Sequence, residues 1–201
     1  MKLYDAPLSG NCYKIRLMLS LLGEKYEKIT VNLAGGTRTD EFRKLNPRGQ
    51  IPVLEDEELL LWDSQAILIY LARRYGGEQW LPTEAAAMAE LMQWMAVAEN
   101  ELLYGLARAR AVKLFKRPWN LAQCQEHGRA GLQVMNEHLA GRDWLCFQHP
   151  TAADIACYPY VALAPAGEIF LSDYPHVQTW MRQIQMLPGY INMEGITPVK
   201  S

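Results

Sequence analysis

Apolar and polar residues alternate with two different periods along the first part of this chain. Residues 2–5 form a short strand-like run, and residues 26–32 alternate with β-branched positions as a strand does. Between these runs, four apolar residues recur at the spacing of one helix face: Ile15, Met18, Leu19 and Leu22. Gly23 follows and is a typical helix end. The pattern predicts a strand, a helix and a second strand.

The next fifty residues predict two more helices on either side of a hairpin. A short helix over residues 40–45 stops before Asn46-Pro47, since the residue before a proline disfavours helical geometry. Apolar runs at 51–54 and 59–62 are separated by acidic residues, which indicates a hairpin. A further helical pattern begins near residue 67. A crossover helix between two parallel strands makes this part an α/β fold.

Beyond residue 83 the strand-like runs disappear and helical periodicity takes over. Long helices are predicted at about 84–111, 118–140, 152–166 and 174–187. We therefore expect an α/β domain over residues 1–77, a linker over 78–83 and an all-helical domain over 84–201.

Composition excludes several classes of function. The chain has 201 residues, a formal net charge of -2 and 21% charged residues of both signs, which indicates no nucleic-acid surface. Lys113, Lys116 and Arg117 come nearest to a basic cluster and are interpreted as a solvated helix end. No run approaches the roughly 18 to 20 apolar residues of a membrane span, and no signal-peptide pattern opens the chain. We expect a cytoplasmic protein without a membrane partner.

The cysteines are scattered and form no metal-binding pattern. Their positions, with no CxxC pair among them, are Cys12, Cys124, Cys146 and Cys157. In a chain of this length they are predicted to be reduced and mostly buried, and no metal site is expected.

Four segments in order resemble the cytosolic, bacterial-type glutathione S-transferases over nearly the whole chain. They are Pro7-Leu8-Ser9-Gly10-Asn11-Cys12-Tyr13-Lys14-Ile15-Arg16, Asn46-Pro47-Arg48-Gly49-Gln50-Ile51-Pro52-Val53-Leu54, Trp62-Asp63-Ser64-Gln65-Ala66-Ile67-Leu68-Ile69-Tyr70-Leu71 and Thr151-Ala152-Ala153-Asp154-Ile155-Ala156. The resemblance implies a thioredoxin-like first domain, an all-helical second domain and glutathione as co-substrate.

Ser9 is the candidate catalytic residue. It lies between a strand and the start of a helix, where backbone N–H groups and the helix dipole favour an anion. The resemblance implies the serine type of active site, in which this hydroxyl stabilises the glutathione thiolate. The alternative is that Ser9 only caps the helix. Tyr4 is a lesser candidate, and Cys12 is interpreted as buried packing.

The resemblance also supplies candidate glutathione-binding residues. Ile51-Pro52 resembles the family's cis-proline step, whose first residue pairs with the peptide backbone, and neutral Gln50 would contact the ligand's backbone or glycyl carboxylate. Arg38 or Arg48 could strengthen that contact.

Asp63 and Ser64 open a predicted helix. They suit an N-cap, and the resemblance adds a contact with the γ-glutamyl head group. Thr151 and Asp154 form a variant capping box, which we assign to folding rather than to chemistry.

A small hydrophobic electrophile would lie between the domains. Its candidate lining residues are Leu8, Met95, Tyr104, Arg108 and Trp119. The family also implies a homodimer, in which the first domain of each subunit packs on the helical domain of the other.

Three alternatives to a transferase stay open. One is a glutathione-dependent disulfide reductase, peroxidase or isomerase on the same frame. Another is a non-enzymatic relative that acts in protein interactions, which a glutathione-affinity column would discriminate. A third, an all-α module fused to a redox domain, would need a CxxC that the first domain lacks.

Overall fold

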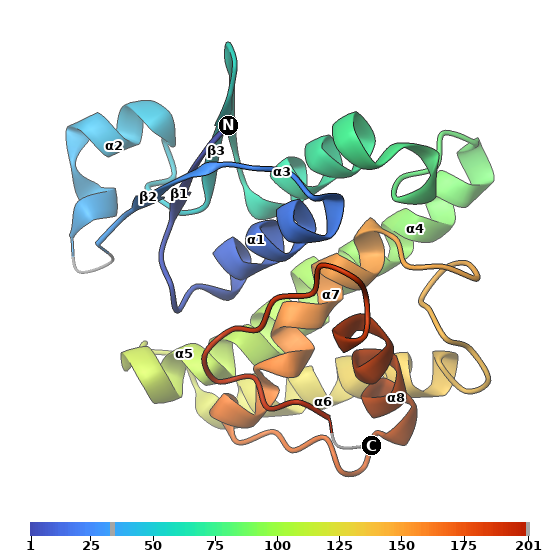
Figure 1. The fold of residues 1–201 in the computed structure, drawn as a ribbon. Helices are drawn as coiled ribbons and strands as arrows, with labels where there is room; N and C mark the ends of the chain where they lie inside the picture. Colours follow the sequence, from blue (N-terminus) through green and yellow to red (C-terminus); the bar gives the residue numbers. More distant parts are fainter. Residues whose placement is uncertain (33–34, 200–201) are drawn as a thin grey trace.

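A four-stranded sheet and a helical bundle make up the molecule (Figure 1). The computed structural model describes residues 1–32 and 35–199, apart from the side chain of Arg38. The strands are β1 (Lys2–Asp5), β2 (Glu27–Thr30), β3 (Val53–Asp56) and β4 (Leu59–Trp62), in the order β2-β1-β3-β4. β1 pairs with β2 in parallel, and β3 pairs antiparallel with β1 and β4. The parallel first pair and the hairpin are both as predicted.

Helices cover the two faces of this sheet unequally. α1 (Gly10–Leu22) and α3 (Ser64–Leu71) lie between the sheet and the helical part, while the short α2 (Asp40–Leu45) lies on the other side (Figure 1). α3 continues as a π-helical turn, Ala72–Gly76, before a 3-10 turn at Gly77–Gln79. Phe42 of α2 packs edge-on against Tyr4 of β1, with ring centroids 6.2 Å apart. The face of the sheet that is turned toward the helical part is thus covered by α1 and α3.

The helical part begins with one long continuous helix. α4 (Ala85–Val97) runs into a π-helical stretch (Ala98–Ala107) and then α5 (Arg108–Phe115). The helix predicted to stop at residue 111 therefore continues to Phe115, where Lys116 ends it in the left-handed region with φ 53°. α6 (Leu121–His138) begins three residues later than predicted, because the Asn120 side chain accepts a bond from the Gln123 N–H and fixes the cap there.

Two more helices complete the bundle. They are α7 (Ala152–Ala162), followed by a 3-10 turn at Ala164–Gly167, and α8 (Pro175–Gln185). The π-helical stretch and α6 approach each other closely through glycines: a Cβ on Gly105 would lie 2.2 Å from the Gly128 backbone nitrogen. Any side chain there would force the helices apart.

α7 runs through the middle of the molecule, and every residue of it is buried. It packs against α1 and α4, so that the core extends without a break from the sheet into the bundle. The Tyr13 hydroxyl on α1 donates to the Ile191 carbonyl at 2.7 Å and ties the C-terminal segment to the first domain. The predicted fold class, a thioredoxin-like α/β part followed by an all-helical part, is confirmed. The domain limits at residues 77 and 84 stay a prediction.

The predicted capping box at the start of α7 is present. Asp154 accepts hydrogen bonds from the Thr151 N–H at 2.8 Å and the Thr151 hydroxyl at 3.0 Å, and both residues are fully buried. The four cysteines are also buried and form no disulfide, as predicted. No helix among the described residues is both long enough and apolar enough to cross a membrane.

Candidate active site

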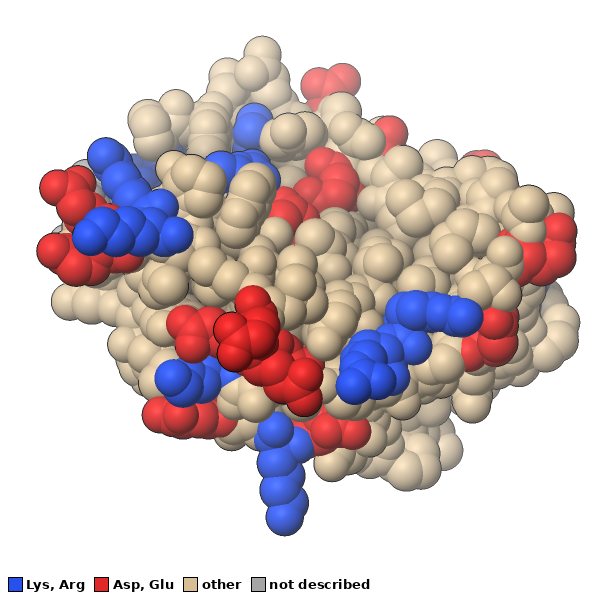
Figure 2. Space-filling model, turned by 90° about the horizontal axis from the view of Figure 1, so that it is seen from above, with Lys and Arg blue, Asp and Glu red and all other residues tan. Residues whose placement is uncertain are grey.

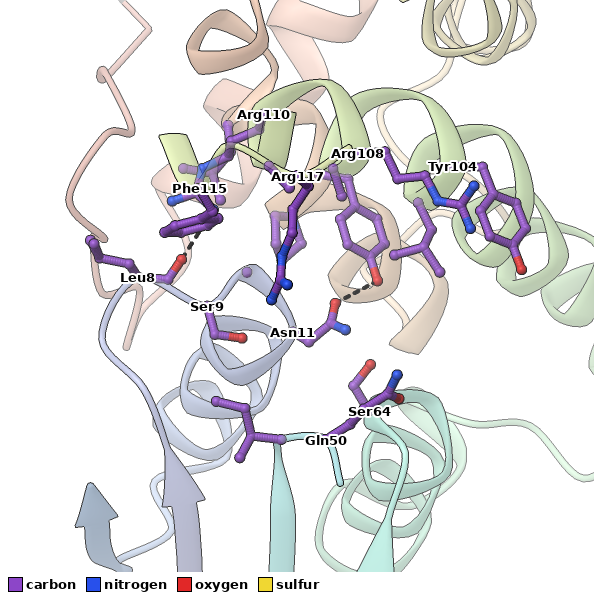
Figure 3. Close-up of a pocket in the computed structure, with 18 of the residues that line it drawn as sticks. Leu8, Ser9, Asn11, Gln50, Ser64, Tyr104, Arg108, Arg110, Phe115 and Arg117 are labelled. Atoms are coloured by element: carbon purple, nitrogen blue, oxygen red, sulfur yellow. Dashed lines mark hydrogen bonds between the residues drawn. The ribbon is translucent and has the colours of Figure 1, made fainter. Parts of the chain in front are cut away.

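A cleft of about 1010 Å³ opens between the N-terminus of α1 and the helical part (Figure 3). One wall comes from the loops and helix starts at the edge of the sheet, including Ser9, Gln50, Ile51, Asp63 and Ser64. The opposite wall comes from the long helix and the loop that follows it, including Tyr104, Arg108 and Trp119. The cleft therefore brings two regions together that are far apart in the sequence.

Ser9 is the N-cap of α1. Its backbone is extended (φ -81°, ψ 119°), and its Oγ accepts a hydrogen bond from the Cys12 N–H at 3.2 Å. Because a hydroxyl both accepts and donates, the Ser9 proton stays available for an acceptor in the cleft. Behind the cap, burial raises the pKa of the Cys12 thiol to about 12, so Cys12 is a protonated packing residue at neutral pH.

Two arginines hold the turn that carries Ser9. Arg16 forms an ion pair with Asp5 and donates to the Pro7 carbonyl at 3.1 Å. Arg110, on α5, donates from Nη1 to the Leu8 carbonyl at 3.0 Å, a bond visible in Figure 3. The position of Ser9 is thus fixed from both parts of the molecule.

A hydrogen-bonded turn presents Gln50. The buried Asn46 side chain donates to the Gln50 carbonyl at 2.7 Å and accepts from the Arg48 N–H at 2.9 Å. Gly49 has φ 60°, and a Cβ there would lie 2.9 Å from the Thr37 carbonyl oxygen, so only glycine suits this close approach. The Ile51-Pro52 bond that follows is cis.

Asp63 and Ser64 start α3 at the floor of the cleft. Asp63 has φ 77°, an unusual value for a residue with a side chain, and its Oδ1 accepts from the Gln65 N–H at 2.9 Å. Its Oδ2 lies 3.0 Å from Arg48 Nη1 in a half-exposed ion pair. Asp63 is therefore the N-cap that the sequence predicts, and it is also held by Arg48, a partner that the sequence did not indicate.

A fully buried lysine lies directly beneath Ser64. Lys14 Nζ donates to Ser64 Oγ and to the Tyr160 hydroxyl, each at 3.1 Å, and lies 3.6 Å from Glu99 Oε1. Burial lowers the pKa of Lys14, while Glu99 and then Asp63 act to raise it. The Tyr160 hydroxyl donates onward to Asn11 Oδ1 at 2.7 Å. This network links α1, α3, α7 and the long helix under the cleft.

Comparisons with known proteins agree along the whole chain. Residues 1–73 match the model of the glutathione S-transferase N-terminal domain, and residues 107–183 match that of the C-terminal domain. Glutathione S-transferase 3 of Zea mays is 32% identical over 99% of this chain and 95% of its own length. This chain belongs to the glutathione S-transferase family.

The names of similar proteins indicate more than one activity. The disulfide-bond oxidoreductase YfcG of Escherichia coli K12 is 30% identical over 93% of this chain and 91% of its own length. A crystal structure of a glutathione S-transferase from Pseudomonas fluorescens Pf-5 is 38% identical with a TM-score of 0.90, covering 96% of this chain and 98% of that one. A second Pf-5 family member, with two glutathione bound, is 29% identical with a TM-score of 0.83, covering 94% of this chain and 89% of that one.

Most of the residues expected from the transferase resemblance meet in the cleft. Those that line it are Leu8, Ser9, Arg48, Gln50, Ile51, Asp63, Ser64, Tyr104, Arg108 and Trp119. Pro52 is buried behind Ile51, and Met95 is 3% exposed in the core, where α4 packs against α7. Met95 is thus not brought to the cleft. The Tyr4 hydroxyl donates to Glu55 at 2.7 Å instead of facing the cleft, and the side chain of Arg38 lies outside the described part.

Sequence reasoning about a transferase missed several residues at this site. They are Asn11, Lys14, Glu99, Arg110, Tyr160 and, as a cleft residue, Arg117. A lysine inside the apolar face of the first helix was the one available signal, because a charged residue is rarely fully buried without a partner.

Proposed function

We propose that this protein activates the thiol of glutathione and transfers the tripeptide to a small electrophile. The observation that carries the proposal is Ser9, an N-cap whose hydroxyl accepts from the Cys12 N–H and lines a cleft of suitable size, where it could donate its proton to a thiolate. Family membership and the glutathione-bound relative support the choice of co-substrate.

The residues on the sheet side of the cleft suit the different chemical groups of glutathione. The Ser64 hydroxyl accepts from Lys14, so its own proton can be donated to the γ-glutamyl carboxylate at the start of α3. Asp63 would meet the ammonium group, in competition with Arg48. Gln50 and the backbone of Ile51 would bind the cysteinyl and glycyl part. The ligand would thus lie along the edge of the sheet, with its sulfur at Ser9.

The energetics of thiolate stabilisation are sufficient with one hydroxyl. Lowering a thiol pKa by two units requires about 2.7 kcal/mol. One charge-assisted hydrogen bond contributes about 1.5 to 3 kcal/mol, and a helix N-terminus about 0.3 to 1 kcal/mol. Ser9 acts by electrostatic stabilisation and forms no covalent bond with the substrate.

The test is a titration of the bound thiol in Ser9 variants. Thiolate absorbance in the ultraviolet is followed against pH in complexes with wild type, Ser9→Ala, Ser9→Gly and Ser9→Thr. Ala and Gly should raise the thiol pKa by about 1 to 2 units, as one lost charge-assisted bond implies, and should slow turnover. Thr keeps the hydroxyl and should retain a low pKa.

The pair Ala and Gly separates chemistry from capping. Gly replaces Ser at an N-cap at a cost of a few tenths of a kcal/mol, whereas Ala costs about 1 kcal/mol. The two variants should therefore share one thiol pKa but differ in stability. An unchanged pKa in both would assign the thiolate contact to another donor.

Disulfide reduction by glutathione is a second candidate, because the relative named as a disulfide-bond oxidoreductase matches over nearly the full length. The buried, protonated Cys12 is unsuited to a protein-thiol mechanism. Two glutathione molecules would instead supply the electrons, forming glutathione disulfide and two substrate thiols. Bis(2-hydroxyethyl) disulfide with glutathione, coupled to glutathione reductase, measures that activity directly.

A further inference from the structure

Three arginines stand on the helical wall of the cleft, opposite the residues proposed for glutathione. Arg108 begins α5 and lies within cation–π distance of two rings: its Cζ is 4.0 Å from the Tyr104 ring centroid and 4.9 Å from that of Trp119. A guanidinium held against aromatic rings in this way can still donate from its N–H edge to a planar acceptor such as a carboxylate.

Arg110 is buried next to Ser9 and incompletely bonded. It is 7% exposed; its Nη1 donates to the Leu8 carbonyl, but its Nε has no hydrogen-bond partner. A buried donor without a partner is uncommon in a folded protein and calls for an acceptor. Arg117 follows α5 and extends into the cleft toward Ser9 and Asn11 (Figure 3).

The positive charge on this wall is not compensated by the protein. Within residues 1–32 and 35–199, none of the three arginines forms an ion pair with a carboxylate. Across the cleft, by contrast, Arg48 pairs with Asp63, and the acidic Glu99 of the long helix is itself paired with Lys14 of α1. Figure 2 shows both signs of charge interspersed over one face of the molecule.

The apolar part of the same wall is aromatic. Tyr104, Phe115 and Trp119 are each about two-fifths exposed and line the cleft around the guanidiniums. Flat rings beside N–H donors form a surface that suits a planar molecule with an acidic group at its edge.

We propose that the second substrate is an aromatic electrophile carrying a carboxylate, which Arg117 and Arg108 bind at the edge of the aromatic wall. This inference rests on the proposed glutathione transfer and specifies its substrate class. In the reaction, the glutathione sulfur forms a bond to an electrophilic carbon and a halide leaves with the electron pair of the broken carbon–halogen bond. The carboxylate is a spectator that positions the ring.

The test uses conjugates that need no turnover. S-(4-carboxybenzyl)glutathione and its 3-carboxy isomer are compared with the corresponding neutral carboxamides by titration calorimetry. One charge-assisted contact should make the tighter-binding of the two carboxylate conjugates bind about tenfold or more tightly than its own carboxamide. Arg117→Gln should reduce this preference, and the double variant Arg108→Gln/Arg117→Gln should reduce it to about twofold or less; added salt should weaken it in wild type because Arg117 is exposed.

Lys116→Gln is the matched control, since it removes an equal charge from the neighbouring residue, which does not line the cleft. It should leave the preference unchanged. Equal affinities of acids and amides, with both binding, would overturn the inference while the glutathione site stands. A preference that survives in Arg108→Gln/Arg117→Gln would overturn its assignment to this wall. If none of the conjugates binds, the proposed function and this inference both fail.

Discussion

Replacing Asp154 with alanine should destabilise the protein more than any change in the cleft. The carboxylate is fully buried and accepts four hydrogen bonds. Its Oδ1 accepts from the Leu145 N–H at 3.0 Å and the Trp180 indole N–H at 2.9 Å, and its Oδ2 from the N–H and hydroxyl of Thr151. Asp154→Ala would leave three buried N–H donors without an acceptor.

Each stranded donor costs about 1 to 3 kcal/mol. The sum is about 3 to 9 kcal/mol, and entry of water into the space left by the carboxylate favours the lower half of that range. We expect a loss of about 4 to 6 kcal/mol, a large share of the roughly 5 to 15 kcal/mol by which domains are stable. Asp154→Asn keeps Oδ1, which still accepts its two hydrogen bonds, but places an amide NH₂ group against the Thr151 N–H. We therefore expect this variant to lose about 1.5 to 3 kcal/mol of stability.

Chemical denaturation followed by tryptophan fluorescence and circular dichroism measures both losses. Burial raises the pKa of Asp154 above 3.8, although the bonds from Trp180, Leu145 and Thr151 lower it. The folded state then binds more protons than the unfolded chain from pH 3.8 up to the folded pKa. The stability that this extra proton binding contributes is complete below that pH window and is lost as the pH rises through it. The stability gap between wild type and Asp154→Asn should therefore narrow with rising pH. A loss below about 2 kcal/mol in Asp154→Ala would refute the hydrogen-bond reasoning, because desolvation of the charge would then offset most of the bonds.

Two further predictions concern glutathione binding and assembly. Lys14→Met should weaken glutathione binding about 10- to 100-fold by calorimetry, since the buried Lys14 ammonium and a γ-glutamyl carboxylate about 6 Å away would attract by about 2 to 3 kcal/mol at an effective dielectric constant near 20. Lys25→Met, at an exposed lysine, is the control. An unchanged affinity in folded Lys14→Met would contradict the role of the buried ammonium. The protein should sediment as a homodimer at micromolar concentration, as the family implies, and a monomer at that concentration would disprove the expectation.

The parts of the site that could be predicted are those built from local chain geometry. Ser9, Asp63 and Ser64 stand at helix starts, and Gln50 stands in a glycine turn, so short sequence signals place each at the end of an element. The sheet then brings these ends to one edge. Because the signals are local and the topology follows from the order of strands, the positions of these residues can be predicted from sequence, whereas their proposed contacts with glutathione rest on the family resemblance.

The network beneath the cleft could not be predicted because it depends on packing between distant segments. Lys14 meets Tyr160 across 146 positions and Ser64 across 50. Whether these groups touch depends on how α7 crosses α1, which no periodicity encodes. Met95 illustrates the same limit. Its helix faces the cleft one turn later, at Glu99, but at Met95 it is covered by α7.

The two walls of the cleft are therefore under different physical constraints. On the sheet side, the functional groups also cap helices and fix turns, so a substitution there changes stability as well as binding. On the helical side, Phe115, Arg117 and Trp119 are exposed, and exposed residues change stability by only about 0.5 kcal/mol when replaced. Under the proposed function, specificity for the second substrate can consequently change through these residues while the proposed glutathione site and the fold stay intact.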